Sequence, residues 1–309
     1  MTISRKLFAI IFAALAGVSL PATHAVAAGG KAKELKHGEW SFSGPFGQYD
    51  QDALQRGYQV YETICSSCHG LEFMYFRNLG QKDGPFYLDK CPAGIPDSVD
   101  CSNPNDNPVV KAIAENYKFQ ITDGPDEFGD MFQRTALPSD PIPGPFPNEQ
   151  IARLANNGAY PPNLSLITKA RHHGVDYVYS LLSGYEEPPS TVEIPVGQYY
   201  NPYYPGDMTQ YLKPEYLDEE GHVREGVKVP LGGVFAMASP LADGIVEYAD
   251  GTPMTVEQYA ADVTHFLAWA AEPKMEARKS LGFVTLIYLV ILAGLLYWSY
   301  RRIWAETPH

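Results

Sequence analysis

The chain has few positively charged residues, no internal repeat and few strand-like segments. Its 309 residues include 23 Lys and Arg against 36 Asp and Glu, which gives a formal net charge of −13. Nucleic-acid-binding proteins need a basic face, so this composition argues against one. An acidic chain can attract basic partners over long distances, or its charge simply keeps it soluble. No internal repeat occurs, and few segments alternate apolar and polar residues as strands do.

Proline and glycine, by contrast, are plentiful. The chain contains 27 Gly and 26 Pro, and they crowd residues 80–165 and 185–255. A small helical core wrapped by such long loops needs something extra to hold it together, and a large buried cofactor would supply that. Together with the helices predicted below, these loops indicate a mainly α protein with long loop insertions.

The N-terminus has the pattern of a secretory signal peptide. Arg5 and Lys6 precede an apolar run over 7–20 that is too short to span a bilayer comfortably. The small residues at 25–27 resemble a cleavage site. We expect residues 1–28 to be removed and residues 29–277 to form an exported domain in a bacterial periplasm.

A second apolar stretch lies near the C-terminus. Residues 281–300 carry no charge, and twenty helical residues cover about 30 Å, the thickness of one hydrocarbon core. Aromatic residues near its end suit the membrane interface, and Arg301 and Arg302 suit the cytoplasmic side. We predict a transmembrane anchor over 278–303 and a cytoplasmic tail over 304–309. The alternative is a buried core helix.

Periodicity predicts three helices. Residues 50–65 place Leu54, Tyr58 and Tyr61 on one face, with an acidic N-cap at their start. Residues 255–271 begin with a capping box and continue with one apolar stripe. A shorter helix is expected over 176–182. The first of these helices runs directly into the motif that carries the chemistry.

That motif is Cys-x-x-Cys-His, formed by Cys65, Cys68 and His69. A thioredoxin-like dithiol needs the pair at a helix N-terminus, whereas here a helix precedes it. A zinc site needs a second ligand pair, and Cys91 and Cys101 are poorly spaced for one. Covalent haem attachment needs two thiols at this spacing, a histidine directly after them, and export. The motif therefore predicts one c-type haem with His69 as an axial ligand of its iron.

The second axial ligand is expected to be a methionine, because a thioether raises the redox potential and closes the iron to small ligands. Met237 lies in FAMASPL, whose small and apolar residues suit packing over a porphyrin. Spacing alone leaves several candidates open: Met131, Met208, Met237 and Met254.

Several long segments together resemble the cytochrome c1 family, the haem subunits of quinol:cytochrome c reductase. They include GQYDQDALQRGYQVYETICSSCHG, NNGAYPPNLSLITKARHHGVDYVYSLLSGYEE, YYNPYYPGD and FAMASPL. The resemblance runs from about Trp40 to Trp304 and implies a cytochrome c-like helical haem domain with a C-terminal transmembrane helix.

The resemblance also assigns residues to the haem. It implies thioether bonds at Cys65 and Cys68, His69 as the proximal ligand and Met237 as the sixth ligand, with Met208 as runner-up. It implies that Arg171 pairs with a haem propionate. The residues expected to line the haem are Asn157, Pro161, Pro162, Leu164, Arg171 and Tyr177.

The implied function is electron transfer without bond chemistry of its own. The haem would accept an electron from the Rieske iron–sulfur protein and pass it to a cytochrome c. Cytochrome b would be the other partner, in a dimeric complex of the bacterial inner membrane, with residues 281–300 in contact with lipid. One alternative is a stand-alone membrane-anchored cytochrome c that feeds a terminal oxidase. The other is a periplasmic thiol–disulfide oxidoreductase.

Some features depart from the family pattern. Residues 208–234 form a long insertion in which Asp218, Glu219 and Glu220 either steer a basic cytochrome c or form a solvated face. Cys91 and Cys101 match no shared family disulfide, yet the periplasm favours a bond between them. Four histidines are expected to be surface or helix-packing residues rather than ligands: His172, His173, His222 and His265.

Overall fold

The computed structural model describes residues 31–306, so the predicted signal peptide 1–28 and the last three residues of the predicted tail lie outside the described residues. The chain divides into two compact units, with a boundary between Lys279 and Ser280. The first unit, up to Lys279, carries the Cys-x-x-Cys-His motif and is described first.

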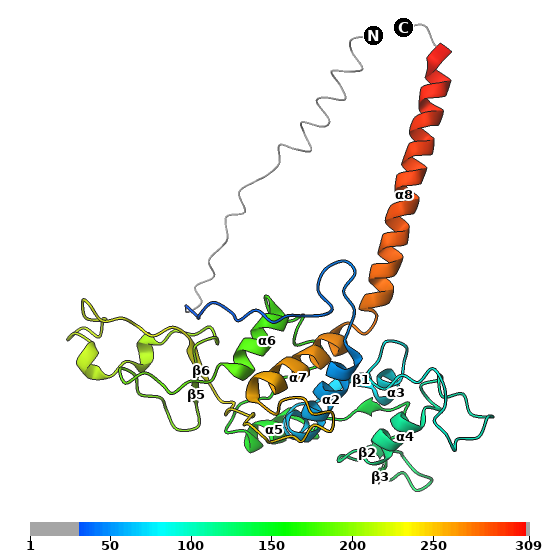
Figure 1. Cartoon of the computed structure of the whole chain (residues 1–309). Helices are drawn as coiled ribbons and strands as arrows, with labels where there is room; N and C mark the ends of the chain where they lie inside the picture. The colour runs from blue at the N-terminus through cyan, green and yellow to red at the C-terminus, as the bar shows by residue number, and fades with distance from the viewer. Residues whose placement is uncertain (1–30, 307–309) are drawn as a thin grey trace. The chain divides into compact units, whose positions relative to one another are not determined.

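The described chain is mainly helical, which confirms the predicted fold class (Figure 1). Its α-helices are α2 (Gln51–Thr63), α3 (Phe76–Leu79), α4 (Pro108–Glu115), α5 (Glu149–Ala155), α6 (Gly174–Ser183), α7 (Val256–Ala271) and α8 (Met275–Ile303). Short 3₁₀ turns are η1 (Cys65–Ser67), η2 (Thr209–Tyr211), η3 (Pro214–Tyr216) and η4 (Trp304–Glu306). The three helices predicted from periodicity are confirmed as α2, α7 and α6.

Strands are short and pair only in twos within residues 31–306. Each pair is antiparallel: β1 (Leu71–Tyr75) with β4 (Pro141–Ile142), β2 (Ile121–Asp123) with β3 (Phe132–Arg134), and β5 (Tyr199–Asn201) with β6 (Gly233–Phe235). In the last pair Tyr199 lies opposite Phe235. Each pair of strands hydrogen-bonds two loop segments to each other.

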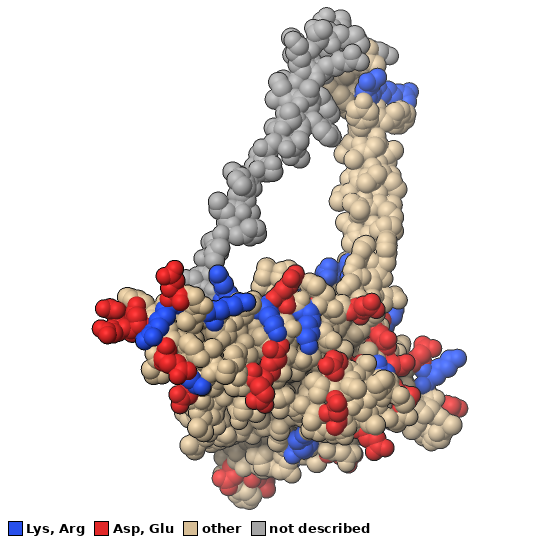
Figure 2. Space-filling view, turned by 60° about the vertical axis from the view of Figure 1, so that its left-hand side comes forward, with Lys and Arg blue, Asp and Glu red and all other residues tan. Residues whose placement is uncertain are grey.

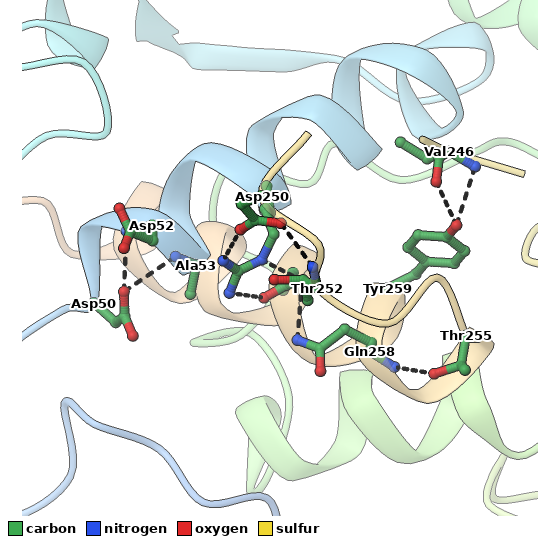
Figure 3. A network of polar contacts seen from close by, with 11 residues as sticks. Asp50, Asp52, Ala53, Val246, Asp250, Thr252, Thr255, Gln258 and Tyr259 are labelled. Atoms are coloured by element: carbon green, nitrogen blue, oxygen red, sulfur yellow. Dashed lines mark hydrogen bonds and ion pairs between the residues drawn. The ribbon is translucent and has the colours of Figure 1, made fainter. Parts of the chain in front are cut away.

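The core forms where α2 packs against α7 (Figure 1). Both helices begin with a side-chain cap, which satisfies backbone N–H groups that have no partner inside the helix (Figure 3). Asp50 accepts from the N–H groups of Asp52 and Ala53, and Thr255 accepts from that of Gln258. The largest fully buried side chains include Trp269, Tyr61, Tyr259, Phe76 and Phe266. Their burial fixes α2, and so the start of the motif that follows it.

Gly57 lets α2 and α7 approach closely. A Cβ atom built there would lie 2.1 Å from the backbone oxygen of Asp262, far inside contact distance. Alanine normally favours a helix over glycine by about 1 kcal/mol, but here overlap with backbone outweighs that gain. We expect Gly57→Ala to lower the free energy of unfolding by about 1–3 kcal/mol, as overpacked cores do. Denaturant unfolding would measure it, and Gly282→Ala, with nothing within 4 Å of its Cβ, is the control.

His265 of α7 is buried and packs inside the fold, as predicted for a helix-packing residue. Its Nε2 accepts from the backbone N–H of Asp50 at 3.1 Å, and the Phe42 ring lies nearly perpendicular to the imidazole with 4.8 Å between the ring centroids. Burial lowers the pKa of His265 to about 4 from its usual 6.5. The imidazole is therefore neutral in the folded protein at pH 7.

This histidine predicts a loss of stability in mild acid. Because the pKa is lower in the folded state than in the unfolded state, its contribution is complete above pH 6.5 and is lost as pH falls toward 4. We expect the wild type to lose about 2 kcal/mol from this group between pH 7 and pH 5. His265→Gln keeps an acceptor without titrating, so unfolding curves of the two proteins should differ in pH dependence. Parallel curves would contradict the prediction.

The predicted insertion 208–234 shares a small second core with the segment that precedes it. Val192, Tyr200, Met208 and Leu212 form a second buried cluster, separate from the main core. Asp218 accepts from the backbone N–H groups of Glu220 and His222, so its carboxylate stabilises a local turn. On the face seen in Figure 2, Asp and Glu are interspersed with Lys and Arg rather than gathered in one field.

Two further expectations concern the cysteine loop and the anchor. Cys91 and Cys101 form a disulfide, which confirms that pairing. Helix α8, whose residues from Ser280 onward belong to the second unit, is the one helix of the described residues that is long and apolar enough to cross a membrane, and none of its apolar stretch is buried. It contains the predicted lipid-contacting stretch 281–300.

Candidate haem site

The motif occupies a tight turn at the C-terminal end of α2. The helix ends at Thr63, and a 3₁₀ turn over Cys65–Ser67 follows. The backbone N–H groups of Cys68 and His69 both donate to the Cys65 oxygen, at 3.1 and 2.9 Å. Cys65 is half-buried against the main core, and Cys68 is exposed. The turn thus presents one thiol at the core edge and one at the surface, directly before the histidine.

The same geometry disfavours thiol–disulfide chemistry. Burial raises the pKa of the Cys65 thiol to about 12, whereas a redox dithiol needs a thiolate near neutral pH. The motif also follows the C-terminus of α2, where the helix dipole opposes negative charge. Among residues 31–306, no group of three or more His, Cys, Asp or Glu side chains could hold a metal ion, so the zinc alternative has no ligand set there.

His69 is held in the tautomer that a metal ligand requires. Its Nδ1 lies 2.8 Å from the backbone oxygen of Pro162. Because a carbonyl oxygen only accepts, Nδ1 carries the proton and the Nε2 lone pair is left for a metal. Burial lowers the pKa of His69, which keeps the ring neutral. The resemblance placed Pro162 near the haem, but its contact with His69 could not be read from the sequence.

The backbone around His69 is fixed from two further directions. The Tyr61 hydroxyl, fully buried on α2, donates to the His69 oxygen at 3.1 Å. The Leu164 N–H donates to the Gly70 oxygen at 3.0 Å, and Leu164 is buried in the main core. Sequence reasoning identified Tyr61 only as a core position. The structure therefore brings the motif together with Pro162 and Leu164.

The remaining predicted lining residues follow along the same segment. Pro161 is half-buried, while Asn157 and Arg171 are exposed. Asn157 has a positive φ of 52° and its Nδ2 lies near Gly197. Tyr177, half-buried on α6, has its pKa raised by burial, an effect that the neighbouring Arg171 guanidinium partly offsets. Arg171 and Tyr177 are thus neighbours, as a shared role at one propionate needs.

Burial separates the methionine candidates. Met237 is half-buried against the main core, the same cluster against which Cys65 packs. Met208 is 1% exposed inside the second cluster. Met131 and Met254 are 60% and 43% exposed. Of the four candidates, Met237 is the one whose surroundings match those of Cys65.

These donors fit a c-type haem. Two unpaired cysteine thiols, a neutral imidazole with a free Nε2 and a half-buried thioether are the groups that attach and ligate such a cofactor. The Pro162 contact supplies the outer hydrogen bond that orients a ligating histidine. The chemistry of the donor set thus agrees with the motif.

Comparison with known proteins gives the same answer. A sequence model described as "Cytochrome C1 family" matches residues 40–307. "Cytochrome b/c1" of Bradyrhizobium diazoefficiens is 44% identical over 87% of this chain, which spans only 35% of that protein. "Cytochrome c1, heme protein, mitochondrial" of Saccharomyces cerevisiae is 43% identical, over 86% of this chain and 71% of that protein. "Cytochrome c1" of Blastochloris viridis is 38% identical, over 96% of this chain and 93% of that protein. The chain belongs to the cytochrome c1 family.

Proposed function

We propose that this chain is the haem-carrying electron-transfer subunit of a quinol:cytochrome c reductase. The observation that carries the proposal is the Cys-x-x-Cys-His turn whose histidine is fixed by Pro162, in a chain that belongs to the cytochrome c1 family. One c-type haem, attached through Cys65 and Cys68, supplies one-electron chemistry at its iron when bound. The chain by itself makes and breaks no substrate bond.

Each residue has a separate task toward that cofactor. Cys65 and Cys68 tether it, and the two hydrogen bonds at Nδ1 and the backbone oxygen of His69 orient the imidazole. Met237 would offer its thioether sulfur to the iron as a second ligand. Arg171 offers its guanidinium, with Tyr177 beside it, to a propionate. Asn157, Pro161, Pro162 and Leu164 are proposed to line the cofactor.

The partners follow from the family. The electron donor is a Rieske iron–sulfur protein and the acceptor is a cytochrome c, in a dimeric complex with cytochrome b. The Bradyrhizobium relative, whose name joins cytochromes b and c1 in one protein, supports a cytochrome b partner. The net charge of −13 suits attraction of a basic cytochrome c, and the carboxylates at 218–220 are one place where it would act.

We place the protein in a bacterial inner membrane. Residues 1–28 would be the cleaved signal peptide and 29–277 the periplasmic haem domain. Residues 278–303 would be the anchor, with 281–300 in lipid, and 304–309 the cytoplasmic tail. The length and composition of α8 support the anchor.

The test is purification of the tagged full chain from its membrane in mild detergent, followed by reduced-minus-oxidised spectra with ascorbate and then dithionite. A c-type band with ascorbate, joined by b-type bands with dithionite, is the expected result. A c-type band alone, in detergent that keeps such complexes intact, would favour a stand-alone carrier that feeds a terminal oxidase. Absence of covalent haem would overturn the proposal altogether.

A further inference from the structure

We propose that Tyr185 is a positioning residue that holds Met237 in place through a hydrogen bond to the backbone. The inference rests on the proposed function, in which Met237 is the second axial ligand. The Tyr185 Oη lies 3.0 Å from the Met237 oxygen and 3.3 Å from the Ala238 oxygen. A phenolic hydroxyl has one proton, so it donates to one of these carbonyls or is shared between both.

The hydrogen bond joins two elements that are far apart in the sequence. Tyr185 follows the end of α6 at Ser183, whereas Met237 comes two residues after the end of β6 at Phe235. Within residues 31–306, the backbone of 236–238 receives a side-chain hydrogen bond from no residue other than Tyr185. Without that bond, the segment depends on β6 and on apolar packing alone.

The tyrosine itself is well anchored. Its ring lies 5.8 Å from that of Phe235, and Phe235 stacks on Tyr204 at 4.8 Å. The β5–β6 ladder fixes Phe235 opposite Tyr199. A rigid donor therefore faces a segment that has little other polar support.

The Tyr185 hydrogen bond is expected to reduce the fraction of time that the Met237 thioether spends away from the iron. A thioether is a weak ligand, and its residence depends on how firmly the surrounding backbone holds it. Loss of one partly buried neutral hydrogen bond, such as that of Tyr185 to the Met237 oxygen, changes such an equilibrium by about fivefold. An added ligand that competes for the vacated position then binds tighter by the same factor, because its apparent affinity follows the fraction of open molecules.

The test is a titration of the ferric full chain with imidazole in detergent, for the wild type, Tyr185→Phe and Tyr200→Phe. Phenylalanine keeps the ring packing and removes only the hydroxyl. Tyr200 is the matched control, because its hydroxyl also donates to a backbone oxygen, that of Leu231 at 2.6 Å, but in the second cluster. We expect Tyr185→Phe to bind imidazole about fivefold more tightly and to weaken the methionine–iron charge-transfer band. Tyr200→Phe should behave as the wild type.

The outcomes separate this inference from the proposed function. Equal imidazole affinity and an unchanged band in Tyr185→Phe, alongside loss of the band in Met237→Leu, would overturn the role of Tyr185 and leave the ligand in place. An unchanged band in Met237→Leu would remove the ligand assignment, and the inference with it. Equal tightening in both tyrosine variants would also overturn it, because the effect would then be general loosening.

Discussion

Replacement of Met237 by leucine is expected to keep the covalent haem and lower its midpoint potential by about 0.1 V or more, within the roughly 0.8 V range that axial ligands span. The thioether favours the ferrous iron, and leucine of similar volume offers no donor atom. A fall of about 0.1 V changes a one-electron equilibrium by about fiftyfold, so the haem becomes harder to reduce and the reduction of cytochrome c during turnover should slow. Redox titration of the purified protein measures the change.

Met208→Leu is the matched control for that variant. Met208 is fully buried in the second cluster, so leucine there should alter packing slightly and leave the potential unchanged. If the midpoint potential fell in Met208→Leu and not in Met237→Leu, the sixth ligand would instead be Met208, in the insertion. Covalent haem should persist in both variants because Cys65 and Cys68 are untouched.

The main helices could be predicted because their signals are local. Periodic apolar residues and a side-chain cap define α2 and α7, and the structure differs from the predicted bounds by only one or two residues at an end. Helices α4 and α5 were missed inside the stretch rich in proline and glycine, although Asn107 and Asn148 cap them and Pro108 starts α4. The capping residues can be recognised in the sequence. Helices of eight and seven residues, however, are too short to establish the helical period of apolar residues.

The strands and the site contacts depend on tertiary structure instead. A strand of three residues, such as β5 or β6, shows no alternation that a sequence pattern could detect. Likewise, the motif indicated that His69 binds iron, but the Pro162 oxygen that sets its tautomer is 93 residues away. Only the folded backbone brings such pairs together, so the sequence can propose which residues bind the iron but not which contacts support them.

Arg56 of α2 carries the second large expected effect. Its guanidinium binds both carboxylate oxygens of Asp262 on α7, at 3.0 and 3.1 Å, and contacts Asp250 at 2.8 Å. The Asp262 side chain is 2% exposed, and the amide of Gln258 also donates to it. We expect Arg56→Met to lower the free energy of unfolding by about 3–5 kcal/mol, because it leaves a buried carboxylate without its counter-charge.

One control variant and one double variant separate the loss of the counter-charge of Asp262 from the loss of packing by the arginine side chain. Arg153→Met removes an exposed pair with Glu149 on α5 and should cost only about 0.5 kcal/mol. Adding Asp262→Asn to Arg56→Met removes the stranded charge while an amide oxygen can still accept from Gln258, so the double variant should be more stable than Arg56→Met alone. Denaturant unfolding of the four proteins gives the comparison. If the double variant were no more stable than Arg56→Met, the arginine would act through its aliphatic packing between α2 and α7 rather than through its charge.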